Sequence, residues 1–395
     1  MTSKSNSHLP PEFVTYYYTQ TLDHFNYKPE SYATFQQKYI KNFKYWGGAS
    51  TSSPIIVYIG EEAPLTFGVH GKGFIVDLAS RFKAMLLYIE HRYYGDSMPF
   101  GSFGEAFRDA NTLGFLSSTQ ALGDCAQLIT DVKRNLSAEN CPAIAIGGSY
   151  GGSNPGPKLT ELQAKQMVLQ PFAIFFIPAE LATWFRLKYP HIALGALASS
   201  APVLYYEDIT PHNAYYSTVT KNYRDTSETC YQNQTILESW AEIQRVGELP
   251  DVALILSKQF ETRTPPRNEN ELRDALAGMY TSTSQYGRPP ENPIEKSVVP
   301  STKQQLDIKP TLQRFTGNII FSNGLRDPYS AGGVLKNISD SIIALPTVNG
   351  SHCLDIVKSS KTSDPDWLVQ QRNTEVEIIE GWIAKYYADL KAINK

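Results

Sequence analysis

A serine flanked by glycines stands directly behind a short apolar run. Residues 147–152 read Gly-Gly-Ser-Tyr-Gly-Gly, which places Ser149 at the centre of a G-x-S-x-G pattern. The apolar residues 142–146 in front of it predict a buried parallel strand that ends at this turn. The glycines allow a strained turn, because a Cβ beside the serine would collide with the adjoining strand and helix. The pattern therefore suggests that Ser149 is a nucleophile held at the end of a strand.

Two segments far downstream supply the partners that a serine nucleophile needs. Asp327 follows the apolar run 317–324, and His352 follows the apolar run 341–348. A serine hydroxyl becomes nucleophilic when an imidazole accepts its proton, and a carboxylate must hold that imidazole in the right tautomer. The order Ser149, Asp327, His352, with the acid and the base each just past a strand, predicts a catalytic triad.

Each of these residues has a simpler interpretation on its own. A single histidine such as His352 is more often a structural turn residue, and an aspartate before a proline, as at Asp327, is more often a helix cap. Two other aspartates compete for the role of the acid. Asp355 lies only three residues past His352, and Asp340 falls within a predicted helix, so both are weaker candidates. The triad is favoured because the three residue types occur together in the required order.

The composition is that of a sizeable globular enzyme. The chain has 395 residues, of which 42% are hydrophobic and 12% aromatic, enough for one large core with an insertion or for two domains. A net charge of −3 and a pI near 6.2 give no basic surface of the kind that binds nucleic acid. No stretch reaches the roughly 18 apolar residues of a membrane span. We therefore expect neither a nucleic-acid partner nor a membrane-spanning helix.

The cysteines and asparagines give weaker signals. No C-x-x-C or H-E-x-x-H pattern occurs, so we expect no metal site and no cofactor. The four cysteines are Cys125, Cys141, Cys230 and Cys353. Sequons make Asn135, Asn233 and Asn337 candidate glycosylation sites, whereas a glycan at Asn349 would crowd the predicted triad. Residues 1–11 are polar and lack the apolar core of a signal peptide, so we expect that the chain as written is not exported by that route.

Strand and helix patterns alternate along most of the chain, which predicts a mostly parallel sheet covered by helices. The other expected strands span residues 13–22, 33–46, 54–59, 84–89 and 193–199. The expected helices span about 119–136, with Leu122, Cys125, Ile129 and Val132 on one face, and about 375–393. Between residues 202 and 312 the alternation of strands and helices stops, and the segment is polar, helix-prone and rich in tyrosine. We therefore divide the chain into an α/β core, residues 1–203 and 312–395, and a helical cap, residues 204–311.

Six segments together resemble one known group of enzymes. They are residues 16–27, 90–97, 147–152, 199–203, 323–328 and 350–355. They are similar to the signature segments of the lysosomal Pro-X carboxypeptidase and dipeptidyl peptidase II family of serine peptidases. The resemblance implies an α/β-hydrolase fold with a central, mostly parallel sheet and an inserted helical cap. It also implies an exopeptidase that acts next to proline in peptide substrates, in the secretory pathway, the lysosome or vacuole, or outside the cell, and it allows a homodimer.

The resemblance also assigns roles within the site. It implies the same triad as nucleophile, orienting acid and general base. The backbone N–H of Tyr150 would be one oxyanion donor, and Glu61, in the loop after the strand 54–59, would provide the second. We favour a carboxypeptidase over a dipeptidyl aminopeptidase; a carboxylate such as Glu61 or Glu62 would instead bind a free amine. An esterase of the same fold is a further alternative. Residues 90–92 are interpreted as a structural ion-pair cluster.

Two departures from the family pattern bear on activity. Residues 153–179 intervene where the family continues directly into a helix, and their opening Ser-Asn-Pro-Gly-Pro should break that helix. The helix matters because its amino-terminal N–H groups stabilise an oxyanion. The insert fits neither flank and looks like translated non-coding sequence, such as a retained intron. The cap is shorter than the family's. A third alternative is therefore an inactive product.

Overall fold

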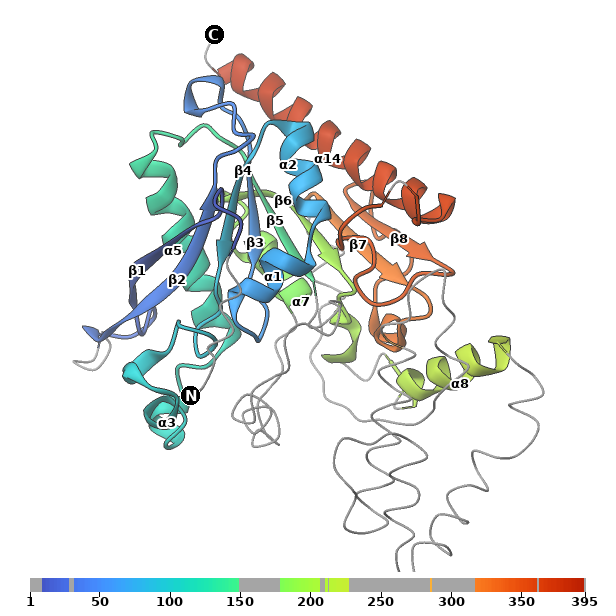
Figure 1. The fold of residues 1–395 in the computed structure, drawn as a ribbon, viewed down its shortest axis with the longest axis horizontal. Coiled ribbons are helices and arrows are strands. Elements are labelled where there is room, and N and C mark those ends of the chain that lie inside the picture. Colours follow the sequence, from blue (N-terminus) through green and yellow to red (C-terminus); the bar gives the residue numbers. More distant parts are fainter. Residues whose placement is uncertain are drawn as a thin grey trace, which may run out of the picture.

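The computed structural model describes residues 9–27, 32–148, 178–206, 210–211, 213–226, 285, 317–360 and 362–393. Within these residues the centre of the molecule is an eight-stranded sheet in the order β1-β2-β4-β3-β5-β6-β7-β8 (Figure 1). The strands are β1 (Val14–Thr21), β2 (Thr34–Asn42), β3 (Ile55–Ile59), β4 (Met85–Ile89), β5 (Ala143–Gly148), β6 (Ala193–Ser199), β7 (Ile319–Gly324) and β8 (Ile342–Thr347). The strands from β4 to β8 run parallel, and β1 and β2 are antiparallel to their neighbours.

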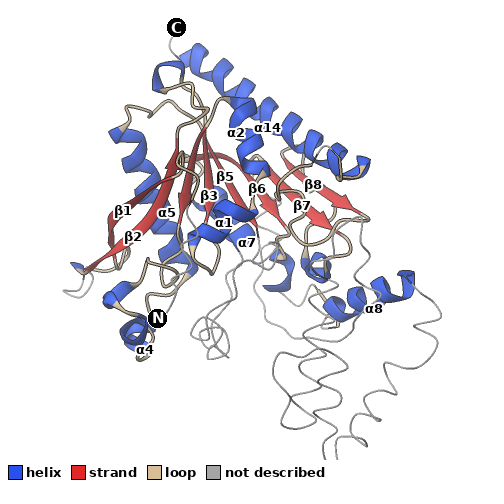
Figure 2. Ribbon diagram, in the orientation of Figure 1, coloured by secondary structure: helices blue, strands red, loops and turns tan. Residues whose placement is uncertain are grey.

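Helices cover both faces of this sheet (Figure 2). The α-helices are α1 (Leu65–Gly71), α2 (Phe74–Phe82), α3 (Phe103–Ala106), α4 (Ala110–Leu113), α5 (Ser118–Asn135), α7 (Pro178–Lys188), α8 (Ala214–Thr226) and α14 (Asp366–Ile393). The 3-10 helices are η2 (Ala49–Thr51), η3 (Pro99–Gly101), η4 (Val203–Tyr206) and η6 (Pro328–Gly332). Apolar side chains of α1, α2 and α14 pack on one face, and those of α5 and α7 pack on the other. This is the α/β-hydrolase fold that the sequence predicts.

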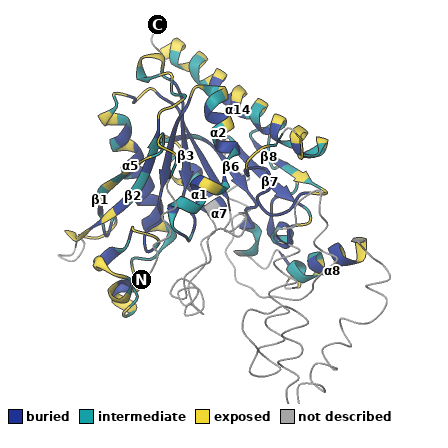
Figure 3. Cartoon of the chain, viewed as in Figure 1, coloured by how far each residue is buried: buried dark blue, intermediate teal, exposed yellow. Residues whose placement is uncertain are grey.

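The central strands are apolar on both faces because helices cover both. Every residue of β3, β4 and β5 is buried, which is why these strands read in the sequence as continuous apolar runs. The edge strand β1 alternates between exposed and less exposed positions instead. Figure 3 shows the buried sheet between helices whose outer faces are exposed. The sheet edge formed by the carboxyl ends of the parallel strands is thereby held rigidly.

The start of the last helix was predicted wrongly. The last helix begins at Asp366 rather than near residue 375. Its first turns bury Arg372 and Glu375 along with Leu368, and buried charged residues interrupt the apolar periodicity from which the start was inferred. The predicted insert 153–179 also overlaps α7, because that helix already begins at Pro178. Residues 153–177 lie outside the described residues.

The N-terminal segment that resembles the family is anchored by a buried polar network. Asp124 of α5 lies between a histidine and an arginine: its carboxylate is 2.8 Å from His24 Nε2 and 2.7 Å from Arg92 Nε. Arg92 also donates to the carbonyl oxygen of Leu22, at 2.9 Å. The side chain of Gln120, again on α5, donates to Asp23 at 2.6 Å. These contacts tie β1 and the segment that follows it to α5 and to the end of β4.

Candidate active site

His352 and Asp327 form a buried acid–base pair at the carboxyl edge of the sheet. Asp327 follows β7 and His352 follows β8, and the parallel register of these strands brings the two loops together. His352 Nδ1 lies 2.6 Å from Asp327 Oδ2, and both side chains are fully buried. Asp327 also caps η6, because its Oδ1 accepts the backbone N–H of Tyr329 at 3.1 Å. The carboxylate therefore fixes the orientation of the imidazole while being fixed itself.

Asp327 makes the imidazole of His352 more basic. Burial by itself lowers the pKa of His352, but the charge and hydrogen bond of Asp327, with a contribution from Cys353, outweigh it and raise the pKa well above its ordinary value. With Nδ1 donating to Asp327, Nε2 is the nitrogen that can take a proton from a hydroxyl. The backbone N–H of His352 donates to the carbonyl oxygen of Gln285, at 2.9 Å, so a residue of the predicted cap contacts this loop.

The predicted nucleophile Ser149 and the donor Tyr150 lie outside the described residues, but the strand that leads to them does not. Its last residue, Gly148, stands in contact with the His352 loop. A Cβ added to Gly148 would lie 2.2 Å from Ile356 Cδ1 and 3.4 Å from Cys353 Sγ. Glycine is therefore required here by close approach. The chain leaves β5 beside the loop that carries the imidazole.

The loop after β3, proposed for the second oxyanion donor, runs along the same edge. Glu61 is buried, and its Oε2 lies 3.8 Å from Lys72 Nζ. Tyr58, near the end of β3, connects this loop to the histidine loop. Its pKa is raised well above the ordinary value by burial first and then by the charges of Glu61 and Cys353. The donor role of Glu61 itself remains a prediction.

Tyr329 is a site residue that the sequence analysis did not identify, and the charge of Glu62 acts on it. The ring of Tyr329 lies against that of His352, with centroids 5.4 Å apart. Burial, and then the charges of Asp327, Glu180 and Glu62, raise the pKa of Tyr329 to about 12. Burial also raises the pKa of Glu62 to about 8, with a further contribution from Glu61. The position of Tyr329 two residues after Asp327 was the only signal available in the sequence.

The rival acids take other places. Asp355 is buried, and its Oδ1 accepts a hydrogen bond from Ser199 Oγ at 2.5 Å rather than from the imidazole. Asp340 lies in an exposed turn before β8, so its assignment to a helix was wrong. The short segment from Ser339 to Ile342 forms a bridge that leaves no room for a helical turn. Of the three aspartates, Asp327 is the one that pairs with His352.

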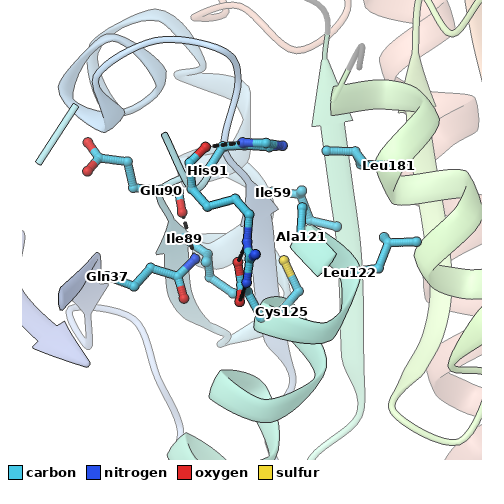
Figure 4. A pocket seen from close by; sticks show the side chains of 12 residues that line it. Gln37, Ile59, Ile89, Glu90, His91, Ala121, Leu122, Cys125 and Leu181 are labelled. Carbon is cyan, nitrogen blue, oxygen red and sulfur yellow. Dashed lines mark hydrogen bonds and ion pairs between the residues drawn. The ribbon is translucent and has the colours of Figure 1, made fainter. Parts of the chain in front are cut away.

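Residues 90–92 make structural contacts beside the site. The carboxylate of Glu90 accepts the backbone N–H of Leu65, at 2.9 Å, and that of Ser97, also at 2.9 Å. His91 Nδ1 lies 2.6 Å from the carbonyl oxygen of Arg92, and burial lowers the pKa of His91 to about 4. These side chains border a small cavity of about 10 Å³ (Figure 4), room for about one water molecule. A cavity of that size cannot hold a peptide.

The remaining candidate residues are placed as follows. Asn135 ends α5 and Asn337 precedes β8, both exposed, whereas Asn233 lies outside the described residues. Cys125, Cys141 and Cys353 are buried thiols, and Cys230 is not described. Within the described residues no group of histidine, cysteine or acidic side chains could hold a metal ion. Among the helices of the described part of the chain, none has the length and apolar character needed to cross a bilayer.

Comparison with known proteins identifies the family. The chain matches the serine carboxypeptidase S28 family over residues 20–154, 176–303 and 294–375. It is 28% identical to the lysosomal Pro-X carboxypeptidase of Homo sapiens, covering 94% of this chain and 88% of the human protein. It is 36% identical to prolyl carboxy peptidase like protein 5 of Caenorhabditis elegans, over 60% of this chain and 40% of that protein. A proline iminopeptidase structure from Mycobacterium smegmatis is 12% identical, with a TM-score of 0.38, over 90% of this chain and 97% of that one.

The same comparisons bear on the two departures in the sequence. Residues 155–175 lie between two matched ranges of the family and belong to neither. The alignment with the human protein spans 474 positions, more than the 395 residues of this chain, so the relative carries segments that this chain lacks. The insert after the serine turn and the shortened cap remain predictions.

Proposed function

The chain belongs to the serine carboxypeptidase S28 family, and from this premise we propose that it hydrolyses peptide bonds next to proline through Ser149, Asp327 and His352. The observation that carries the proposal is the buried His352–Asp327 pair, 2.6 Å apart, beside the end of the strand that leads to Ser149. The proline preference is supported by similarity to the lysosomal Pro-X carboxypeptidases.

The proposed reaction proceeds in two steps. Ser149 Oγ attacks the carbonyl carbon next to proline and gives its proton to His352 Nε2, while Asp327 stabilises the imidazolium. The backbone N–H groups of Tyr150 and Glu61 receive the negative oxygen of the tetrahedral intermediate. His352 then protonates the leaving amine, and an acyl-enzyme on Ser149 remains. In the second step a water molecule gives a proton to His352 and attacks the acyl-enzyme. His352 then returns the proton to Ser149 Oγ, and the carboxylic acid product is released.

The end of the peptide that is recognised decides between two activities. We favour the carboxypeptidase because the relatives that cover most of the chain carry that name. One observation favours a dipeptidyl aminopeptidase instead. Glu62 lies near Tyr329, whose ring packs on His352, and its buried Oε1 has no hydrogen-bond partner among the described residues. A carboxylate in that position could pair with a free amine.

A tripeptide of the form X-Pro-Y separates the alternatives, because both activities cleave its Pro-Y bond. With the carboxypeptidase, acetylation of the amino end leaves cleavage intact and amidation of the carboxyl end abolishes it. The reverse pattern, together with loss of cleavage in Glu62→Gln, establishes the aminopeptidase. Turnover of simple acyl esters alone, with no peptide cleaved, overturns both in favour of an esterase. Ser149→Ala is the control for a contaminating peptidase.

The location proposed for the protein is the lysosome or vacuole, or another compartment of the secretory pathway. It is supported by the lysosomal relatives and by the exposure of Asn135 and Asn337. When the protein is produced in a secretory host, removal of N-glycans should reduce its mass. In Asn135→Gln and in Asn337→Gln, the loss of mass on removal of N-glycans should each time be smaller by the mass of one glycan.

A further inference from the structure

A cluster of four buried polar side chains lies behind the His352 loop. Two are serines on the neighbouring strands β6 and β7, where they are register partners. The other two are carboxylic acids, one from the loop that follows His352 and one from α14. The four are Ser199, Ser322, Asp355 and Glu375, each at most 4% exposed. The cluster joins β6, β7, α14 and the chain three residues past His352. It is therefore the connection between the catalytic loop and the core.

The hydrogen bonds in this cluster leave each acid half satisfied. Ser199 Oγ donates to Asp355 Oδ1 at 2.5 Å, and Ser322 Oγ donates to Glu375 Oε1 at 2.9 Å. Gln371 Nε2 donates to the oxygen of Ser322, at 2.7 Å, so the single hydroxyl proton of that serine is directed toward the carboxylate. Asp355 Oδ2 and Glu375 Oε2 are buried and have no hydrogen-bond partner among the described residues. Unsatisfied buried carboxylate oxygens are costly.

The nearby cation, Arg372, counteracts the raised pKa of both acids through its charge but makes its hydrogen bonds with other groups. Arg372 of α14 donates to the carbonyl oxygens of Leu354, Asp355 and Val357, and to the carboxylate of Asp364 at 2.6 Å. Its hydrogen bonds therefore hold the loop backbone and a third acid. The other titratable groups described between β8 and α14 are His352, which pairs with Asp327, the buried thiol of Cys353 and the exposed Lys358.

Burial raises the pKa of Asp355, and burial together with the charge of Asp355 raises that of Glu375 well above its usual range. Two ionised carboxylates can only accept hydrogen bonds, so neither can satisfy the other. If one of the two carboxylates is protonated, its O–H group can donate a hydrogen bond. The proton also removes one of the two negative charges.

We propose that Asp355 and Glu375 share one proton in the folded protein and that this pair positions the His352 loop for catalysis. They are positioning residues, because they act on the reaction only through the loop. The positioning role rests on the proposed function, whereas the shared proton does not. Loss of the proton at higher pH leaves two ionised carboxylates buried in one cluster, which weakens the attachment of the loop to β6, β7 and α14.

The proton sharing predicts a defined pH dependence of stability. A carboxyl group whose pKa is raised by folding stabilises the folded state fully below the unfolded pKa of about 4.3, and this stabilisation is lost as the pH rises through the folded value. Between the unfolded and the folded pKa, the folded state binds one proton more than the unfolded state. In that pH range the folding equilibrium constant falls about tenfold for each unit by which the pH rises.

The test compares the full chain with Glu375→Gln, which keeps the side-chain size and carries a permanent donor. Glu377→Gln, on the exposed surface of the same helix, is the matched control. Folding equilibrium constants are measured by urea unfolding from pH 4.5 to 8.5. We expect the ratio of the Glu375→Gln constant to the unsubstituted one to rise about tenfold per pH unit from about pH 4.5, and the control ratio to stay flat. Asp355→Asn, which neutralises the other member, should behave like Glu375→Gln.

Activity tests the positioning role separately. The kcat/KM of Glu375→Gln relative to the unsubstituted chain should rise with pH over the same range, whereas a merely structural substitution would change it equally at every pH. Stability ratios that stay flat with pH overturn the shared proton, and an activity ratio that stays flat overturns the positioning role. If the unsubstituted chain cleaves no peptide at any pH, the proposed function and the positioning role fail, while the unfolding data still decide whether the proton is shared.

Discussion

Asp327 is the residue on which the geometry of the site depends most. Its two carboxylate oxygens have separate tasks: one accepts from His352 Nδ1 and the other caps η6. The side chain thus selects the tautomer of the imidazole and is itself held by a turn of backbone. The role that the sequence suggests for an isolated Asp327, a helix cap before proline, is also correct. One residue performs both functions.

Asp327→Asn should reduce kcat by about 10⁴-fold, because the amide no longer holds the catalytic tautomer. The charge of Asp327 raises the pKa of His352, so the acid limb of the kcat/KM profile should move to lower pH in the variant. A raised histidine pKa stabilises the folded state below about pH 6.5, and this contribution is lost as the pH rises through the folded value. The loss of stability in Asp327→Asn should therefore be largest at acidic pH.

Steady-state kinetics and urea unfolding across pH measure both effects. Asp340→Asn, in an exposed turn, is the control and should change neither. An unchanged acid limb in Asp327→Asn would mean that Asp327 does not set the pKa of the catalytic base.

At the scale of elements, α7 is the helix that the predicted insert would affect most. Leu181, Ala182 and Phe185 pack it against the sheet in the position of the helix that should follow the nucleophile directly. Twenty-eight residues separate Ser149 from the start of this helix at Pro178, where a continuous helix needs none. The packing of α7 is therefore retained although its covalent connection to the nucleophile is long.

Deletion of residues 153–179 should join the serine turn to α7 and increase both kcat/KM and soluble yield. A helix that starts at the nucleophile supports the turn, and a misplacement of about 1 Å can cost on the order of 100-fold in rate. Cleavage of X-Pro-Y by the two chains measures the effect. A transcript that lacks the codons of residues 153–179 would give independent support. Equal activity of the intact and shortened chains contradicts this explanation of the insert.

The buried network around Asp124 makes a second prediction at this scale. Asp124→Ala removes the partner of both His24 and Arg92, whose guanidinium is fully buried. Leaving a buried cation unpaired should lower the free energy of unfolding by about 3–5 kcal/mol. Asp389→Ala removes an exposed i,i+4 partner of Lys385 and should cost only about 0.3–0.5 kcal/mol. Urea unfolding compares the two; similar losses would show that the network is not a structural anchor.

The elements were predictable wherever one physical rule dominated. Buried parallel strands read as apolar runs, so the strand at residues 193–199 was predicted with its bounds. The start of α14 was missed because Arg372 and Glu375 are buried through hydrogen bonds, which hydrophobic periodicity does not register. The contact of Tyr329 with His352 was missed for a similar reason: it depends on the turn after Asp327, not on spacing in the sequence.

At the scale of the whole molecule, the fold brings the segments that carry the proposed catalytic residues to one edge of the sheet. Parallel strands β5, β7 and β8 end side by side with β6 between the first two, so residues about 200 positions apart in the sequence can act together. Helices on both faces make this edge rigid, which a site that needs sub-ångström placement requires. The loop after β3 and the cap residue Gln285 reach the same edge.

The central claim is that Ser149 is activated by His352 at that edge, and covalent labelling tests it most directly. The full chain is treated with a serine-directed phosphonofluoridate, and the modified peptide is located by mass spectrometry. We expect a single adduct on Ser149, with a labelling rate reduced at least about 100-fold in His352→Ala, because only an activated serine reacts quickly. An adduct on another serine, or an equal rate of labelling in His352→Ala, would contradict the account.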